Sequence, residues 1–331
     1  MIACVFGRAF VPFVEKVVHD LRAATAALGG EMHAMTLETA LADPKRAAEV
    51  RRLYVLPLDA PAGTPPALFM REVFPHAETV TSFAVQDLCW DKIATQEVLV
   101  KRGVPVPDTV ISSEPEDVLQ FVAEHEFAVL KQRHGCGGQG HLVVWFEDGE
   151  LVGDSGSHQY RIKLASHGRL HLAGDQLTYP GPFYAQRLVA DVDRRLSPCQ
   201  ILRAYIVDSQ IAFWTERYRD QYLRPSDWIV SAGRGAKYRF LHDLSEEAKK
   251  VAIRSAEVIG IRAGAVDLVR TGSAGPYVLE VETDGHHTFV DRQFKHLPEY
   301  RDFFNLDRYI AEALLAEPAP PQRPPMAKNS R

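Results

Sequence analysis

Apolar and polar residues alternate along the first part of the chain in a pattern that predicts strands separated by helices. The strand-like apolar runs are residues 2–6, 32–37 and 53–58. Residues 13–28 have helical spacing, and Gly29-Gly30 would end that helix. Strands that alternate with helices are typical of an open α/β sheet. We therefore expect residues 1–87 to form a small α/β domain.

Beyond residue 88, apolar runs come in neighbouring pairs joined by turn residues, which predicts antiparallel hairpins. The predicted strands are residues 127–131, 142–146, 183–188, 201–207, 210–214, 266–269 and 277–282. Helical spacing and capping residues predict helices at 91–103, 244–259 and 306–315. This second part of the chain is expected to be α+β.

Acidic residues interrupt the hairpin formed by 266–269 and 277–282. Strand alternation predicts one apolar face made of Tyr277, Leu279 and Val281. Glu280 and Glu282 would then share the other face, and pairing across the turn can bring Asp267 beside them. Crowded carboxylates favour a bound cation, and all-oxygen ligands suit magnesium or manganese. From these residues alone, the solvated acidic face of a half-exposed hairpin is an equal alternative.

A glycine-rich stretch lies between the strands 127–131 and 142–146. Its glycines are Gly135, Gly137, Gly138 and Gly140. Glycines let the backbone approach a ligand closely and offer N–H groups to phosphate oxygens. A strand follows, whereas the nucleotide-binding fingerprints of other folds need a helix there. The alternative is a flexible hairpin turn without a ligand.

Two basic residues occupy positions that call for an anionic partner. Lys92 lies in the first turn of a helix that Asp91 can cap, where a lysine opposes the helix dipole. The alternative for Lys92 is simple exposure. Arg203 interrupts an apolar strand, so it needs a ligand or a buried partner, for which Glu216 across the hairpin is a candidate.

Composition narrows the functional classes. With 331 residues the chain can form about two or three domains. Its net charge of −5 argues against binding to nucleic acid or a membrane surface. Four cysteines without paired spacing favour a cytoplasmic protein with reduced thiols, and neither a transmembrane run nor a signal peptide is expected. The proline-rich residues 317–331 are predicted to be a disordered tail.

Taken in order, five segments make the chain resemble the ATP-grasp ligases, among them bacterial glutathione synthetase and the ligases that add glutamate to a ribosomal protein. The segments are DKIATQEVLVKRGVPVPDT, FAVLKQRHGCGGQGHLVV, FYAQRLV, ILRAYIVDSQIAFWTERY and GAVDLVRTGSAGPYVLEVE. The resemblance implies an α/β (α+β) protein with the ATP-grasp fold: an N-terminal open α/β domain, residues 1–87, and an ATP-grasp domain, 88–316. The latter would comprise subdomains of about 115–187 and 188–316, with ATP between two antiparallel sheets.

The resemblance also implies a nucleotide site. Lys92 and Lys131 would hold the phosphates of ATP and the edge of the adenine site. The glycine loop 135–140 would close over these phosphates. The residues lining the adenine would be Gln186, Arg187 and Leu188, and backbone groups of the last two would bind its edge. Asp191 or Asp193 would bind the ribose, and Asp193 is our candidate.

The metal and phosphoryl-transfer residues follow from the same resemblance. Asp267, Glu280 and Glu282 would bind two magnesium ions, with manganese as a substitute. Arg203 and Arg217 would face the transferred phosphoryl group or the acceptor carboxylate. Asparagine is usual in the family where Glu282 stands, so this chain adds charge to the site.

The implied activity is an ATP-dependent carboxylate–amine ligase that works through an acylphosphate. A kinase that makes a stable phosphorylated product and a non-catalytic nucleotide-binding partner are the alternatives. The substrates would be an amino acid, a peptide or a small metabolite, and a thiol could replace the amine. Residues 283–287 stand where the family usually has a turn of small residues and proline after the last metal ligand. In that run, His286 and His287 would be substrate contacts, a second metal site or surface histidines, and we favour substrate contact. For the assembly of the protein, a homodimer is our candidate.

Overall fold

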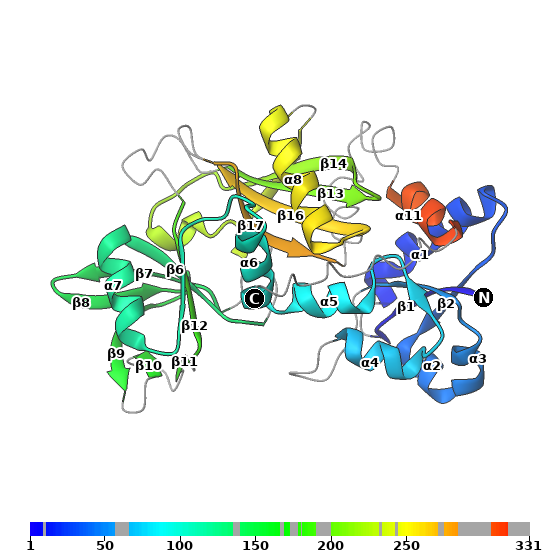
Figure 1. Ribbon diagram of the computed structural model, residues 1–331, viewed down its shortest axis with the longest axis horizontal. Helices are drawn as coiled ribbons and strands as arrows, with labels where there is room; N and C mark the ends of the chain where they lie inside the picture. The colour runs from blue at the N-terminus through cyan, green and yellow to red at the C-terminus, as the bar shows by residue number, and fades with distance from the viewer. Residues whose placement is uncertain are drawn as a thin grey trace, which may run out of the picture.

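The computed structural model describes residues 1–8, 11–56, 66–134, 140–165, 169–172, 178–179, 181–189, 200–231, 234–241, 244–270, 275–283 and 306–316. These residues form three β-sheets that follow one another along the long axis of the molecule (Figure 1). The central sheet lies between the N-terminal sheet and the largest sheet. No helix in the described ranges has the length and apolar character needed to cross a membrane.

The N-terminal sheet has four parallel strands in the order β2-β1-β3-β4. The strands are β1 (Ile2–Phe6), β2 (Met32–Thr36), β3 (Arg52–Val55) and β4 (Glu78–Thr79). The helices between and after them are α1 (Val11–Ala27), α2 (Leu37–Ala42), α3 (Pro44–Ala48), α4 (Pro66–Val73) and α5 (Phe83–Trp90). Both faces of β1 are buried, as parallel strands require. The predicted open α/β sheet is therefore present.

The largest sheet has eight strands in the order β11-β10-β9-β8-β7-β6-β12-β5. Its strands are β5 (Thr109–Ser112), β6 (Phe127–Lys131), β7 (Leu142–Glu147), β8 (Glu150–Asp154), β9 (Gln159–Ala165), β10 (Arg169–Leu172), β11 (Thr178–Tyr179) and β12 (Phe183–Arg187). Helix α7 (Pro115–His125) buries Val118 and Phe121 against this sheet. The strands between β7 and β12 were not predicted from the sequence.

The central sheet has five antiparallel strands in the order β15-β14-β13-β16-β17. They are β13 (Gln200–Val207), β14 (Gln210–Tyr218), β15 (Lys237–Phe240), β16 (Ala263–Arg270) and β17 (Tyr277–Glu282), with the 3₁₀ turn η2 (Pro225–Trp228) between β14 and β15. Its helices are α6 (Lys92–Lys101), α8 (Glu246–Ile259) and α11 (Leu306–Leu315).

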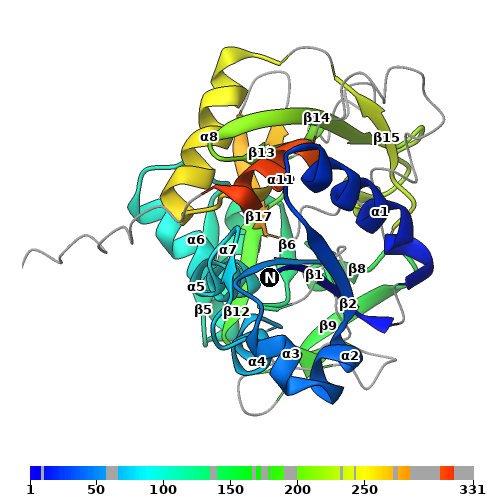
Figure 2. The same cartoon turned by 90° about the vertical axis from the view of Figure 1, so that its right-hand side faces the viewer.

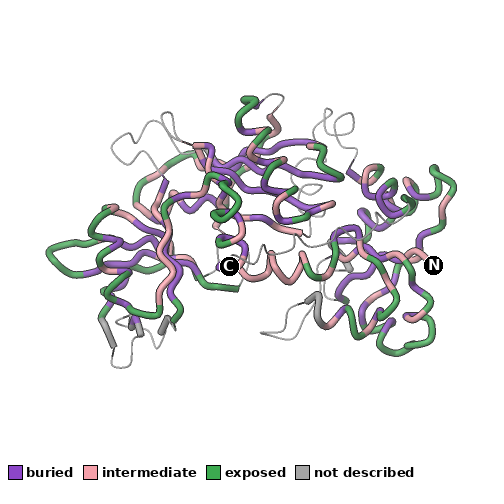
Figure 3. Tube along the Cα trace, in the orientation of Figure 1, coloured by how far each residue is buried: buried purple, intermediate pink, exposed green. Residues whose placement is uncertain are grey.

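Helix α8 covers one face of the central sheet, and the opposite face carries the charged residues described below. Its small residues Ala248, Ala252 and Ala256 pack on apolar side chains of β13, β16 and β17. Ser245 caps α8, as predicted, by accepting a hydrogen bond from the Ala248 N–H. Helices α1 and α11 lie side by side near the N-terminal sheet (Figure 2). Their buried residues form one core with residues of the N-terminal sheet and of the central sheet. Strands β13, β14 and β16 are accordingly buried along most of their length (Figure 3).

A β-bulge changes the predicted faces of the acidic hairpin. Asp267 lies opposite Glu280, but its neighbour Leu268 lies opposite Val278, so Leu279 is an extra residue on β17. Val278 and Val281 therefore face the same core beneath α8. The prediction that Tyr277, Leu279 and Val281 share one face was wrong, because it assumed unbroken alternation.

Candidate functional site

Three carboxylates meet on the face of the central sheet that is opposite α8. Asp267 comes from the middle of β16, and Glu280 and Glu282 come from β17. One ligand oxygen from each can be chosen so that all lie within 4.8 Å of one another. Asp267 is buried, whereas both glutamates are partly exposed. The predicted convergence of these residues is thus observed, and their oxygen-only set suits magnesium.

Two arginines lie against these carboxylates. Arg203 Nε and Nη2 donate to the two oxygens of Asp267, at 2.7 and 3.0 Å, and Nη2 also donates to Glu282 Oε2 at 2.6 Å. Arg217 Nη2 donates to Asp267 Oδ1 at 3.1 Å. Burial opposes the charge of Arg203, but Asp267 and Glu282 raise its pKa well above the usual value. The strand arginines and the candidate metal ligands therefore form one charged cluster.

Glu216 is not the partner of Arg203. It lies one residue from Arg217 on β14, so its side chain is on the opposite face of the sheet. There it accepts a hydrogen bond from Arg239 Nε at 2.6 Å. The predicted pairing across the hairpin was wrong, because strand alternation separates the two side chains.

Lys92 reaches the cluster from the start of α6. Its ammonium donates to Glu280 Oε1, so the anionic partner indicated by its position exists within the protein. Asp91 caps α6, as predicted, by accepting from the Ile93 and Ala94 N–H groups. Asp91 also accepts two hydrogen bonds from Arg133, at 2.6 and 3.0 Å. Burial would raise the pKa of Asp91, but these hydrogen bonds hold it below its usual value.

The eight-stranded sheet contributes Lys131 and Gln186. Lys131 ends β6 and donates to Gln186 Oε1 at 2.6 Å. Both side chains are buried. Burial and the nearby Lys92 lower the pKa of Lys131 to about 8, although Glu280 and Asp267 act in the opposite direction. Lys131 therefore has a titratable charge close to the carboxylate cluster.

Sequence reasoning missed three polar side chains that continue from Gln186. They are Gln96 on α6, Thr109 at the start of β5 and Tyr184 on β12, and all belong to one hydrogen-bonded group. Gln96 is four residues after Lys92, so helical spacing could have indicated that both point the same way. No local signal marks Thr109, which comes into position through strand pairing with Gln186.

A hydrogen bond joins the residue that follows the glycine loop to the segment that precedes β15 of the central sheet. Arg234 Nη2 donates to the His141 carbonyl oxygen at 2.5 Å. Burial and the charges of Lys131, Lys92 and Arg234 lower the pKa of His141 well below its usual value. Of the predicted loop glycines, Gly140 has a φ of +70°. Gly135, Gly137 and Gly138 lie outside the described residues, as do Asp191, Asp193, His286, His287 and the tail 317–331.

The two residues after Gln186 use their backbone N–H groups within the protein. The Arg187 N–H donates to the Asp108 carbonyl at 2.8 Å, and the Leu188 N–H donates to the Phe127 carbonyl at 3.1 Å. The Arg187 guanidinium forms an ion pair with Asp108 at 2.9 Å. An adenine read by the backbone here would therefore depend on carbonyl groups, and the predicted adenine role of these residues stays a prediction.

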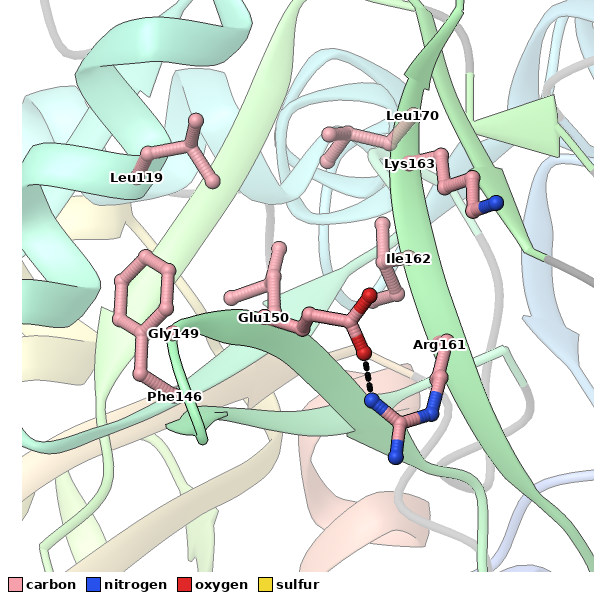
Figure 4. Close-up of a pocket in the computed structure, with 9 residues that line it drawn as sticks. Leu119, Phe146, Gly149, Glu150, Arg161, Ile162, Lys163 and Leu170 are labelled. Atoms are coloured by element: carbon pink, nitrogen blue, oxygen red, sulfur yellow. Dashed lines mark ion pairs between the residues drawn. The ribbon is translucent and has the colours of Figure 1, made fainter.

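A separate cavity of about 260 Å³ lies between α7 and strands β8 to β10 (Figure 4). Leu119, Ile162 and Leu170 contribute apolar walls, and an ion pair between Glu150 and Arg161 lies at its edge. None of its lining residues belongs to the charged cluster. This cavity is therefore distinct from the candidate site.

Comparison with known proteins identifies the fold. No protein-family model matches the chain. The tetrahydromethanopterin:alpha-L-glutamate ligase of Methanocaldococcus jannaschii is 23% identical over 197 residues, which are 60% of this chain and 59% of that ligase. The chain thus spans about three fifths of the length of this curated relative.

Solved structures match over nearly the whole chain. The D-cycloserine synthetase DcsG has a TM-score of 0.62 and 17% identity, and the match covers 95% of this chain and 100% of that one. The ATP-grasp ligase PsnB, solved with a minimal precursor, Mg and ADP, has a TM-score of 0.55 and 15% identity, with 93% and 97% covered. The predicted fold is confirmed: the chain has the ATP-grasp fold. In sequence it is similar to alpha-L-glutamate ligases.

Proposed function

We propose that this protein is an ATP- and magnesium-dependent ligase that joins a carboxylate to an amine. The observation that carries the proposal is the convergence of Asp267, Glu280 and Glu282 with Arg203 and Lys92 on one face of the central sheet. Such a cluster provides ligands for a divalent cation and positive groups for phosphate oxygens at the same place. The similarity to glutamate ligases supports the same chemistry.

The donor set fits magnesium, because carboxylate oxygens are its usual protein ligands. Asp267, Glu280 and Glu282 would hold two magnesium ions, and manganese would substitute for them. Bound magnesium would supply fixed positive charge beside the ATP phosphates. Lys92 and Lys131 would bind these phosphates, the glycine loop 135–140 would cover them, and Asp193 would bind the ribose.

In the proposed reaction, a carboxylate oxygen of the substrate attacks the γ-phosphorus of ATP. The bond from this phosphorus to the β–γ bridging oxygen breaks, giving an acylphosphate and ADP. An amine nitrogen then attacks the acyl carbon, loses a proton and expels phosphate. Arg203 and Arg217 would neutralise the negative charge that gathers as two anions approach each other.

The acid and the amine would be small metabolites, amino acids or peptides. A peptide is included because PsnB, which shares the fold, was solved with the precursor peptide PsnA2. A homodimer and a cytoplasmic location remain our predictions for the protein.

The decisive experiment is a screen for ADP release with pairs of candidate acids and amines, followed by mass spectrometry of the products. An amide formed together with ADP and phosphate is the expected result. A stable phosphorylated product with ADP would identify a kinase. Failure to bind MgADP would contradict an ATP-dependent enzyme altogether.

A further inference from the structure

A group of buried polar side chains lies where α6, β5, β6 and β12 meet, directly behind Lys131. Gln186 is 1% exposed, Tyr184 2% and Gln96 4%. Burying an amide without hydrogen bonds is costly, so these groups must have fixed partners. The directions of their hydrogen bonds can be deduced from the donors and acceptors available.

Thr109 sets these directions, because a hydroxyl has one hydrogen to donate. That hydrogen goes to the Pro107 carbonyl oxygen at 2.8 Å. The Thr109 oxygen can therefore only accept from other groups. It accepts from Gln96 Nε2 at 3.0 Å and from Gln186 Nε2 at 3.4 Å. Both amides must turn their NH₂ groups towards Thr109.

With its NH₂ group turned to Thr109, each amide presents its oxygen elsewhere. Gln96 Oε1 accepts from the Tyr184 hydroxyl at 3.4 Å. Gln186 Oε1 accepts from Lys131 Nζ at 2.6 Å, while its Nε2 also lies 3.5 Å from the Tyr184 oxygen. The opposite orientation of Gln186 would set an NH₂ group against an ammonium, donor against donor.

We propose that Thr109 and Gln96 are positioning residues for nucleotide binding, which act by holding the Gln186 amide oxygen on Lys131. The inference rests on the proposed function, in which Lys131 binds ATP phosphates. Neither residue needs to touch the nucleotide. Thr109 fixes the direction of the hydrogen bonds, and Gln96 fixes Tyr184, which borders the ammonium at 5.5 Å from the ring centre.

The test compares Thr109→Val, which keeps the shape and loses the hydroxyl, with Thr109→Ser, which keeps the hydroxyl. The dissociation constant of MgADP is measured by calorimetry on the folded full-length protein. We expect about tenfold weaker binding for Thr109→Val, the cost of about one misdirected hydrogen bond, and near-normal binding for Thr109→Ser. Gln96→Leu should also weaken MgADP binding, and this variant replaces Thr109→Val in the test if Thr109→Val does not fold.

Thr25→Val is the matched control. The Thr25 hydroxyl is buried in α1 and donates to the Leu21 carbonyl at 2.7 Å. The Thr25→Val substitution should lower the melting temperature of the protein without changing its affinity for MgADP. Equal MgADP affinity in wild type, Thr109→Val and Gln96→Leu would overturn the inference while leaving the ligase proposal intact. A wild type that binds no MgADP would instead contradict the ligase proposal.

Discussion

Arg203 and Asp267 form a two-point ion pair in the interior of the central sheet, with Nε to Oδ1 at 2.7 Å and Nη2 to Oδ2 at 3.0 Å. They lie directly opposite each other on β13 and β16, so the pairing is set by strand register. A cation that binds Asp267 must therefore share the Asp267 carboxylate with the Arg203 guanidinium. The net charge of the site depends on both the cation and the guanidinium.

Replacing Arg203 with Met should make the protein depend on magnesium for stability. Removing one partner of a buried ion pair costs about 3–5 kcal/mol, because Asp267 and Glu282 lose the guanidinium that they share and, among the described residues, only Arg217 still donates to Asp267. Millimolar Mg²⁺ should then raise the melting temperature of Arg203→Met more than that of the wild type. Arg239→Met is the control, because it removes the hydrogen bond and the positive charge that Arg239 supplies to Glu216 on the opposite face of the same sheet. An equal magnesium response in both variants would contradict a metal site at Asp267.

Glu280→Gln should abolish turnover and leave the fold intact. The change removes one negative charge from the candidate metal ligands and keeps the shape of the side chain. ADP release and circular dichroism give the two readouts. Glu216→Gln, a buried carboxylate on the other face of the sheet, should keep its activity per folded molecule. Near-normal turnover by folded Glu280→Gln in millimolar magnesium would remove Glu280 from the site.

Nucleotide affinity should fall as pH rises above about 8. Burial lowers the pKa of Lys131 to about 8, so its ammonium is charged below that pH and neutral above it. Phosphates favour the charged form, so binding should raise this pKa and take up a proton. Calorimetry of MgADP binding in buffers of different ionisation enthalpy measures that uptake.

Lys131→Arg is the control for this pH dependence, because a guanidinium stays charged over the whole range. Its MgADP affinity should lack the decline above pH 8. A decline of the same size in Lys131→Arg would assign the titration to another group.

Gly264→Ala should disturb the metal site through the backbone. A Cβ atom on Gly264 would lie 2.2 Å from the carbonyl oxygen of Glu282, so β16 and β17 would have to move apart. We expect a stability loss of about 1–3 kcal/mol from this overpacking, together with weaker magnesium binding. Gly153→Ala is the control, because the nearest atom to its Cβ, at 2.8 Å, would be the flexible end of the Ile162 side chain and no backbone atom. Unchanged melting and magnesium binding in Gly264→Ala would show that the strands can separate freely.

Much of the secondary structure follows from the sequence, because it depends on residues close together in the chain. The strand 127–131 and the helix near 306–315 match β6 and α11. Asp91 and Ser245 cap the helices they were expected to cap. The acidic pair on the last strand was also visible, because strand alternation places residues two apart on one face.

The partners within the site were decided by the tertiary structure. Lys92 and Glu280 are 188 residues apart, and Arg203 and Asp267 are 64 apart. A bulge at Leu279 shifted one face of the hairpin, and strand pairing brought Thr109 beside Gln186. Local sequence patterns therefore predicted many of the elements and the charges that they carry, but not strands β8 to β11. Strand register and the packing of sheets determined which charges meet, because these contacts depend on the whole fold and no local pattern encodes them.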